Sequence, residues 1–317
     1  MNVEALIFQQ IVDANFDQSI STASPNNTIN VVQIAAKGSG TNIGLALSPK
    51  GTGYISAQVP DGATAGGNAR GTRSVDLQTF RYANTQVASG SNSFVFPGEG
   101  STASGFNSIA GGGQSRALSN YSFAFGNACT AQNMIDFAIG NNTTASGNYS
   151  FACGDRGQAT AKNSACYGAL ALAYRENMFA IGVWNPNNAR AHAQGFFLPI
   201  RVRTTNDTPT NMIVGDASAA INLPSNAVLN CTLELIGMKS DGTAIAAYTR
   251  KIRIRNVAGT TSLIGSVETI GTDEAAGTAL SVTANNTTDT LDVTVTGIAS
   301  ETWNWAGFLI GVEGRIS

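Results

Sequence analysis

The fold of this chain is decided by residues 122–154, which read SFAFGNACTAQNMIDFAIGNNTTASGNYSFACG. Here Gly126, Gly140 and Gly154 follow one another at intervals of fourteen residues. The same interval extends in both directions and links seven glycines: Gly98, Gly112, Gly126, Gly140, Gly154, Gly168 and Gly182. A fixed period of this kind predicts stacked repeats, in which each repeat is one unit that cannot bury its own apolar face alone.

Small residues form two further columns in phase with the glycines. One column stands two residues before them: Ala110, Ala124, Ala138, Ala152, Cys166 and Ala180. The other stands five residues after them: Ala103, Ala117, Ala131, Ala145, Ala159 and Ala173. The columns lie seven residues apart, so each repeat is predicted to be one coil of two short strands that face each other across a thin interior.

Side chains next to the first column are large and apolar, whereas those next to the second are mostly Thr, Ser and Gln. Successive strand residues point to opposite faces, so the apolar neighbours must point away from the coil interior. The resulting stripe is larger than a soluble monomer normally exposes, which predicts that further copies cover it around a symmetry axis. The residues predicted at this axis are Phe123, Phe125, Phe137, Ile139, Phe151, Phe179 and Ile181.

The segments Ser122–Gly126, Asp136–Gly140 and Ser150–Gly154 resemble the repeats in the heads of trimeric autotransporter adhesins. The resemblance covers residues 85–195 and implies a left-handed parallel β-roll that packs as a homotrimer through its larger apolar side chains. Phe96 and Pro97 depart from the pattern in the first coil, and Tyr167 departs from it further on.

Residues 1–84 are predicted to form a separate N-terminal region, with an amphipathic helix over 3–14 and strands over 30–36 and 42–47. Two segments of this region, Gly66–Gly71 and Ser74–Gln78, and the segment Thr85–Gly90 that follows it resemble sequences of bacteriophage tail-fibre-like proteins. This resemblance implies a virion component, with the N-terminal region attached to another virion protein.

Residues 196–317 lose the fourteen-residue period and alternate apolar with polar side chains instead, as in Leu229, Cys231, Leu233 and Leu235. Short alternating runs separated by turns predict an antiparallel β-sandwich, with a jelly-roll-like arrangement. The sequence therefore predicts an all-β chain in which a trimeric roll of about seven coils, roughly 33 Å long, is followed by a sandwich that closes its last edge.

Composition argues against several classes of partner. The formal net charge of -2 gives no reason to bind nucleic acid. No stretch approaches the roughly 18 apolar residues of a membrane-spanning helix, so membrane insertion is not expected. The start lacks a signal-peptide pattern, which fits a virion protein made in the host cytoplasm. Four scattered cysteines and one histidine, His192, predict no metal site and no cofactor.

Candidate receptor contacts lie in the last domain. Lys251, Arg253 and Arg255 alternate with isoleucines and form a basic row, which is either a solvated face or a site for acidic surface sugars and phosphates. Trp303 and Trp305 share one strand face, where core packing and a sugar platform are alternatives, core packing being the favoured one.

No catalytic residue is predicted, because paired carboxylates are missing from the roll. Glu99 and Asp155 share a register but stand four coils apart, about 19 Å, well beyond the roughly 5–9.5 Å that glycosidases use. The predicted function is a non-enzymatic virion fibre that binds a glycan or protein receptor on the host surface. The alternatives are a head fibre or capsid decoration protein, a bacterial trimeric surface adhesin, and a polysaccharide-degrading tailspike.

Overall fold

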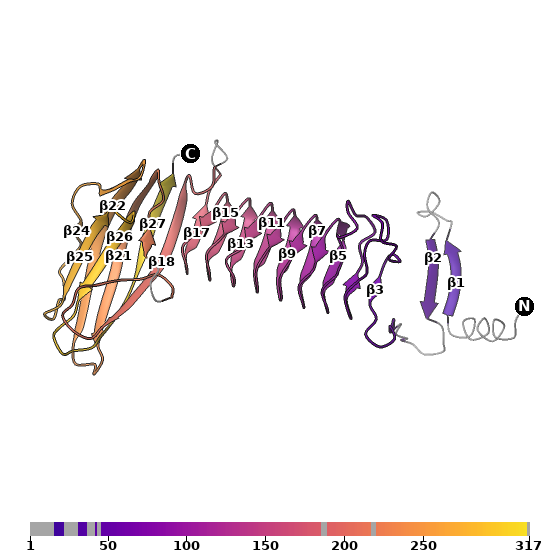
Figure 1. Cartoon of the computed structure of the whole chain (residues 1–317), viewed down its shortest axis with the longest axis horizontal. Coiled ribbons are helices and arrows are strands. Elements are labelled where there is room, and N and C mark those ends of the chain that lie inside the picture. Colours follow the sequence, from indigo (N-terminus) through magenta and orange to yellow (C-terminus); the bar gives the residue numbers. More distant parts are fainter. Residues whose placement is uncertain are drawn as a thin grey trace, which may run out of the picture. The chain divides into compact units, whose positions relative to one another are not determined.

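The computed structural model of the chain (Figure 1) describes residues 16–21, 31–36, 42, 46–184, 189–216 and 220–315, with side chains described from residue 42 onward. It divides into two compact units, residues 1–51 and 52–317. The described residues form strands, turns and loops, without a helix, in agreement with the predicted all-β class.

The first unit contains a hairpin of β1 (Phe16–Ser21) and β2 (Val31–Ala36), which pair antiparallel. The predicted strand over 30–36 is therefore confirmed. Of the predicted strand over 42–47, the described residues 42, 46 and 47 are not in a strand. The predicted helix over 3–14 lies outside the described residues.

The second unit begins with the roll, in which every repeat contributes one strand to each of two parallel sheets (Figure 1). The first roll sheet contains β5 (Phe94–Glu99), β7 (Ile109–Gly113), β9 (Phe123–Asn127), β11 (Phe137–Asn141), β13 (Phe151–Asp155), β15 (Ala165–Ala169) and β17 (Phe179–Gly182). The second roll sheet contains β6 (Thr102–Ala103), β8 (Arg116–Ala117), β10 (Thr130–Ala131), β12 (Thr144–Ala145), β14 (Gln158–Ala159) and β16 (Leu172–Ala173). These strands make six complete coils, and β17 adds a seventh strand to the first sheet.

Both alanine columns line the roll interior and are fully buried, as predicted. Two more buried columns complete the interior; most of their residues are small and polar, and Met178 in the last coil is the large exception. A serine at these positions satisfies its hydroxyl locally. Ser108 Oγ, for example, donates to the carbonyl of Gly105 at 2.7 Å. The two alanine columns face each other across the thin middle of each coil, which explains the absence of leucine from both columns.

The glycine period has a steric cause. A Cβ atom added to any glycine from Gly98 to Gly168 in the ladder would lie 2.0–2.4 Å from the carbonyl oxygen of the next glycine. From Gly112 to Gly168 the φ angles also lie between +86° and +128°, which side-chain-bearing residues rarely adopt. Each coil therefore depends on a glycine directly beneath the glycine of the next coil.

Parallel pairing begins before residue 85, the expected start of the roll. β3 (Ile55–Ser56) pairs parallel with β4 (Val75–Asp76), and β4 pairs parallel with β5. The irregular coil expected at Phe96 and Pro97 is present, since the register of β5 shifts between Val95 and Gly98. Residues 52–84 thus join the same compact unit as the roll.

The C-terminal region is an antiparallel two-sheet sandwich, as predicted. Its larger sheet has the order β23, β22, β21, β27, β18, and its smaller sheet pairs β19, β20 and β25 with β26. The strands are β18 (Gln194–Thr204), β19 (Thr210–Asn211), β20 (Ile221–Asn222), β21 (Ala227–Lys239), β22 (Ile245–Val257), β23 (Thr260–Leu263), β24 (Glu268–Thr269), β25 (Ala279–Asn285), β26 (Thr290–Thr296) and β27 (Trp303–Arg315). Leu233, Ile252 and Val293 are among the buried residues between the sheets.

One continuous sheet joins roll and sandwich, because β18 pairs antiparallel with β17 (Figure 1). At its C-terminal end the second roll sheet has no such partner strand, and a glutamine side chain closes it instead. The amide of Gln194 accepts from Leu172 N at 2.9 Å and donates to Leu172 O at 3.1 Å. At the other end the amide of Gln78 bonds Ser101 N and Ser101 O in the same way, both at 3.0 Å. The Gln194 amide thereby replaces one residue of a missing strand, which protects an edge that would otherwise invite further pairing. At the N-terminal end the Gln78 amide extends the backbone pairing that Ala103 already makes with Ala88.

Candidate interaction surface

The outer face of the first roll sheet carries two in-register rows of uncharged, mostly apolar residues, here called the apolar band. One row is Phe94, Ile109, Phe123, Phe137, Phe151, Ala165 and Phe179, and the other is Gly111, Phe125, Ile139, Cys153, Tyr167 and Ile181. Phe137, Phe151 and Phe179 are each 39% exposed, large values for phenylalanine. All seven residues predicted at a symmetry axis lie in this band.

The second roll sheet differs in chemistry on its outer face. Residues such as Thr130, Thr144 and Gln158 occupy its outward positions and are partly solvated. The roll is therefore amphipathic, with one face suited to water and the other suited to an apolar partner.

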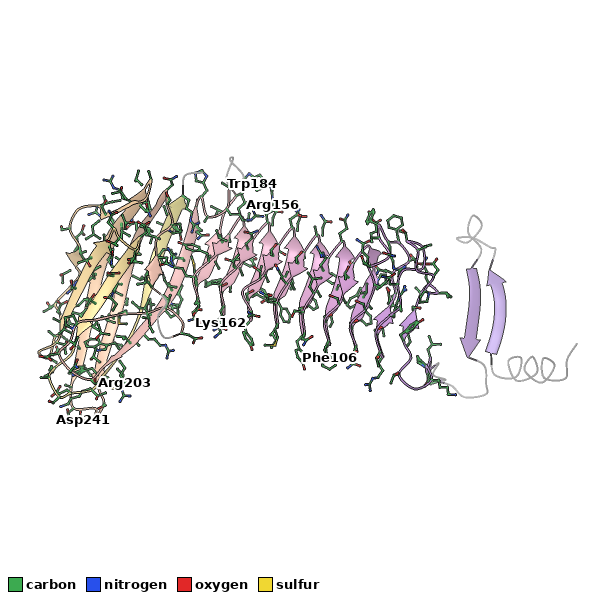
Figure 2. All side chains as sticks on the ribbon, in the orientation of Figure 1. Phe106, Arg156, Lys162, Trp184, Arg203 and Asp241 are labelled. Atoms are coloured by element: carbon green, nitrogen blue, oxygen red, sulfur yellow. The ribbon has the colours of Figure 1, made fainter. Side chains whose placement is uncertain are left out.

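Both long edges of the roll carry aromatic residues that the sequence analysis did not single out. Figure 2 shows Arg156 and Trp184 on one edge and Phe106 and Lys162 on the other. The Arg156 guanidinium lies 4.7 Å from the centre of the Trp184 ring, and Phe106 packs edge-on against Tyr121 at 5.6 Å. The positive φ of Tyr121 and Tyr149 turns these side chains outward at the coil corners, a feature that periodicity alone does not reveal.

The tail-fibre-like segments form a buried polar cluster at the N-terminal end of the roll. Asp76 Oδ2 lies 2.8 Å from Arg70 Nε and 3.0 Å from Arg81 Nη2, and all three side chains are fully buried. Arg81 also donates to the carbonyls of Gln86 and Gln78. Together with the Gln78 amide, these residues close the first coils, so the segments have a structural role in this chain.

A second buried cluster joins the last coil to the sandwich. Glu313 accepts hydrogen bonds from Tyr174 Oη at 2.7 Å, Arg315 Nε at 2.9 Å and Arg175 Nη1 at 3.2 Å. Burial by itself raises the pKa of Glu313, but the charges of Arg175 and Arg315 outweigh it and hold that pKa below its usual value. Arg175 and Arg315 also stack on the Tyr174 ring, at 4.2 and 4.0 Å from its centre. The carboxylate therefore stays charged at neutral pH and fixes the junction.

The predicted basic row lies on the outer face of the larger sandwich sheet. Arg253 and Arg255 are exposed and Lys251 is half-buried, while Ile252 and Ile254 face the core. Arg253 Nη2 pairs with Glu268 Oε1 at 2.7 Å, so its charge is partly compensated. The alternation predicted from the sequence is present, and a role in receptor contact stays a prediction.

For Trp303 and Trp305 the favoured alternative, core packing, is confirmed, and the alternative of a sugar platform in contact with a receptor is wrong. Both are core residues, 0% and 2% exposed, and their rings stack with centres 5.8 Å apart. Their indole nitrogens are also bonded, to Glu301 and Thr204 respectively. Both side chains lie on the side of β27 that faces the smaller sheet. Their rings are therefore not available to a receptor.

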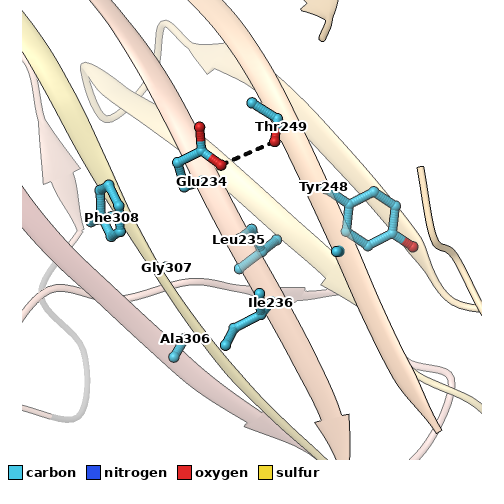
Figure 3. Close-up of a pocket in the computed structure, with 9 residues that line it drawn as sticks. Glu234, Leu235, Ile236, Tyr248, Thr249, Ala306, Gly307 and Phe308 are labelled. Carbon is cyan, nitrogen blue, oxygen red and sulfur yellow. Dashed lines mark hydrogen bonds between the residues drawn. The ribbon is translucent and has the colours of Figure 1, made fainter. Parts of the chain in front are cut away.

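A hollow of about 280 Å³ lies on the outer face of the larger sheet, between β21, β22 and β27 (Figure 3). Ala306, Gly307 and Ala247 keep it open because their side chains are small, and Ile236 and Phe308 line its sides. Glu234 stands at its rim and accepts a hydrogen bond from Thr249 Oγ1 at 3.0 Å. Glu234 is the one carboxylate among the described residues lining it, so the hollow does not assemble the carboxylate pair used by most glycosidases.

The other candidate acids are also separated. The register of the first roll sheet places Glu99 and Asp155 four coils apart, as the sequence indicated. Glu99 accepts from Tyr82 Oη at 3.0 Å, which contributes to a raised Tyr82 pKa. The hydrogen bond from Asn141 lowers the pKa of Asp155, with Arg156 adding to the effect.

The described cysteines differ in accessibility. Burial raises the pKa of both Cys166 and Cys231 to about 12, and Cys129 is fully buried in the roll interior. Cys153 alone among these four is partly exposed, and it stands in the apolar band. The reactivity of its thiol therefore depends on whether the apolar band is covered.

Comparisons with known proteins agree with the roll. The YadA head domain repeat matches in two copies, over residues 103–128 and 137–156, so the adhesin-head-like repeat is confirmed in the middle of the roll. No protein of curated function matches the sequence. Within the described part of the chain, no helix has the length and apolar character needed to cross a membrane.

Three phage proteins are among the similar solved structures. The Acinetobacter baumannii phage AM24 tailspike has 10% identity and a TM-score of 0.25, covering 81% of this chain and 48% of its own. The tailspike gp49 of Acinetobacter baumannii bacteriophage Fri1, a capsular polysaccharide depolymerase, has 8% identity and a TM-score of 0.24, covering 81% and 52%. The Acinetobacter phage vB_ApiP_P1 tailspike has 9% identity and a TM-score of 0.20, covering 84% and 80%. This chain spans about half the length of the first two.

Proposed function

We propose that this protein is a homotrimeric, non-enzymatic fibre of a bacteriophage particle that attaches the particle to the host surface. The apolar band carries the proposal. Two in-register rows of partly exposed phenylalanine, isoleucine and other uncharged residues are costly to leave in water, and the same rows on two further copies cover them around one axis. The adhesin-head repeat, whose family packs as trimers, supports the same arrangement.

The trimer is tested by the mass of the purified chain in solution, measured by light scattering. Three copies of the 32.7 kDa chain are expected at micromolar concentration. Cys153 gives an independent readout, because a short bismaleimide should join its thiols between copies while the three buried cysteines stay unmodified. A stable monomer without Cys153 cross-links would contradict the proposal.

The placement on a virion rests on the tail-fibre-like segments, of which Gly66–Gly71 and Ser74–Gln78 supply the buried Arg70, Asp76 and Gln78 of the roll's first coils. The N-terminal unit is then the part held by another virion protein, and the sandwich is the part that meets the host. Labelled antibody against the chain, imaged on purified particles by electron microscopy, separates a tail fibre from a head fibre or decoration protein. Labelling of uninfected bacterial surfaces instead would favour the surface adhesin.

The basic row is the proposed receptor contact, and acidic surface sugars or phosphates are the proposed ligand class. Three chains per fibre present three rows, so weak single contacts gain strength by avidity. Replacing Lys251, Arg253 and Arg255 together by Ser should reduce binding to host cells at least about ten-fold and make the remainder less sensitive to salt. Arg116→Ser, on the polar face of the roll, is the matched control.

A fibre that only binds should release no reducing ends from host polysaccharide. Release that disappears in a Glu234→Gln variant would instead establish a tailspike hydrolase centred on the hollow in Figure 3. Binding without release supports adhesion as the function.

A further inference from the structure

The apolar band does not stop where the roll stops. In the first row Phe179 pairs with Phe197 of β18, and Phe197 pairs with Ile310 of β27. In the second row Ile181 pairs with Gly195, and Gly195 pairs with Val312. The two rows therefore cross from the roll into the sandwich without a change of register, although the chain reverses its direction between β17 and β18.

The continuation is as exposed as the band itself. Phe197, Ile310 and Val312 are 37%, 50% and 57% exposed, and Phe197 leans on Phe308 with ring centres 5.1 Å apart. Gly195 leaves a mostly apolar hollow of about 450 Å³ between Ile181 and Ile310. Such a hollow receives a protruding side chain of a partner, as the core of a packed interface does.

The band ends abruptly one strand further on. Ile310 pairs with Thr232 of β21, and Thr232 pairs with Lys251 of β22. In the other row Val312 pairs with Asn230, and Asn230 pairs with Arg253. Both rows thus contain uncharged residues as far as β27, become polar at β21 and become basic at β22. A change from an apolar centre to a polar and charged rim is the pattern of an interface boundary.

We infer that the sandwich domains of the trimer also pack against one another, through β18 and β27, and that this contact ends at β21. The inference rests on the proposed trimer, and the occupant of the extended band is a second copy of the same chain. Continuity with the roll interface selects that occupant, since a symmetry axis that runs along the roll rows meets Phe197, Ile310 and Val312 in the same rows. Charge agrees with it, because none of these positions carries a charge and like-charged basic rows are kept outside the contact.

One consequence concerns the proposed receptor site. The basic row on β22 lies one strand beyond the boundary at β21 and is held at a fixed distance from its copies instead of moving with a free domain. Preorganised spacing of this kind raises avidity for a repetitive surface.

Cysteine cross-linking tests the inference in the full-length chain. Ile310→Cys and Thr232→Cys place thiols in the same row on adjacent strands, in a Cys153→Ser background. After brief treatment with a short bismaleimide, Ile310→Cys should give at least about ten-fold more inter-chain product than Thr232→Cys on a denaturing gel. Val312→Cys against Asn230→Cys repeats the comparison in the second row and guards against a variant that does not fold.

The cross-linking results distinguish the contact between sandwich domains from the contact between rolls. The inference would be overturned if the parent chain cross-links at Cys153 but the variants give no cross-links at positions 310 and 312, although both thiols still react with a monofunctional maleimide. The trimeric roll would then remain intact. Absence of cross-links at Cys153 as well, with a monomeric mass, would remove the proposed trimer itself. Equal products at Ile310→Cys and Thr232→Cys would overturn the boundary at β21.

Discussion

Single glycines allow successive coils of the roll to stack closely. Gly140 has φ +125°, and a Cβ atom there would lie 2.0 Å from Gly154 O, a backbone atom that cannot move without disturbing the next coil. We expect Gly140→Ala to lower the free energy of unfolding by about 3 kcal/mol or more, through steric strain and lost ladder hydrogen bonds. Gly113→Ala is the control, because its Cβ would meet the movable Asn127 side chain at 3.1 Å. Melting curves at equal protein concentration measure both, and equal losses would contradict the steric explanation.

Ile135 has a strained backbone conformation that another residue type would relieve. Ile135 has φ +58°, a left-handed conformation that β-branched residues avoid, and its side chain is 39% exposed. Equivalent corners of other coils carry Asn107, Asn163 and Asn177. Ile135→Asn should therefore raise stability by about 1 kcal/mol, while Asn163→Ile should lower it by a similar amount. Thermal denaturation of both variants against the parent chain checks the pair, and stabilisation by Asn163→Ile would refute the argument.

At the scale of elements, the edge of the second roll sheet depends on one side chain. Gln194→Leu removes both partners of Leu172, leaving one N–H and one C=O unpaired at the end of the ladder. Each such group costs about 1–3 kcal/mol where it is buried. We expect faster hydrogen exchange at the Leu172 amide and a lower melting temperature, while Gln132→Leu, an exposed position next to β10, should change neither. Unchanged exchange at Leu172 would show that the cap is dispensable.

The junction between roll and sandwich should be sensitive to acid. Because the folded pKa of Glu313 lies below its usual 4.5, its stabilising effect is fully present above that value and is lost as pH falls through the folded pKa. Glu313→Gln should lower the melting temperature at pH 7, and the gap from the parent chain should shrink toward pH 3. Acids shared by both proteins cancel in this difference, so a gap that stays constant with pH would contradict an ionised Glu313.

At the scale of the whole molecule, assembly should depend on the outer face of one roll sheet and not on the other. Phe151→Asp places a carboxylate in the apolar band, where the proposed interface leaves it without a partner at a cost of several kcal/mol per chain. The expected result is a monomer or a weakened trimer by light scattering. Thr144→Asp, on the outward face of β12, should leave the mass at three copies. A fully trimeric Phe151→Asp would require another interface.

The sequence by itself determined the roll. The glycine period, the two alanine columns and the apolar outer rows are each imposed by contacts between one coil and the next, and such contacts repeat at a fixed interval along the chain. The alternation of the last domain predicted its antiparallel strands for the same reason, since period two follows from local strand geometry. The same alternation allowed the basic row at Lys251, Arg253 and Arg255 to be predicted.

Only the tertiary structure decided what joins the parts. Trp303 and Trp305 face the core because of which side of β27 meets the smaller sheet, and the alternation is the same for either side. Gln78 and Gln194 close sheet edges formed by residues more than twenty positions away, and Arg175 meets Glu313 across 138 residues. The extension of the apolar band onto β18 and β27 is likewise set by pairing between distant strands. Contacts of this range leave no period in the sequence, because each is made once and depends on where the folded chain brings its segments together.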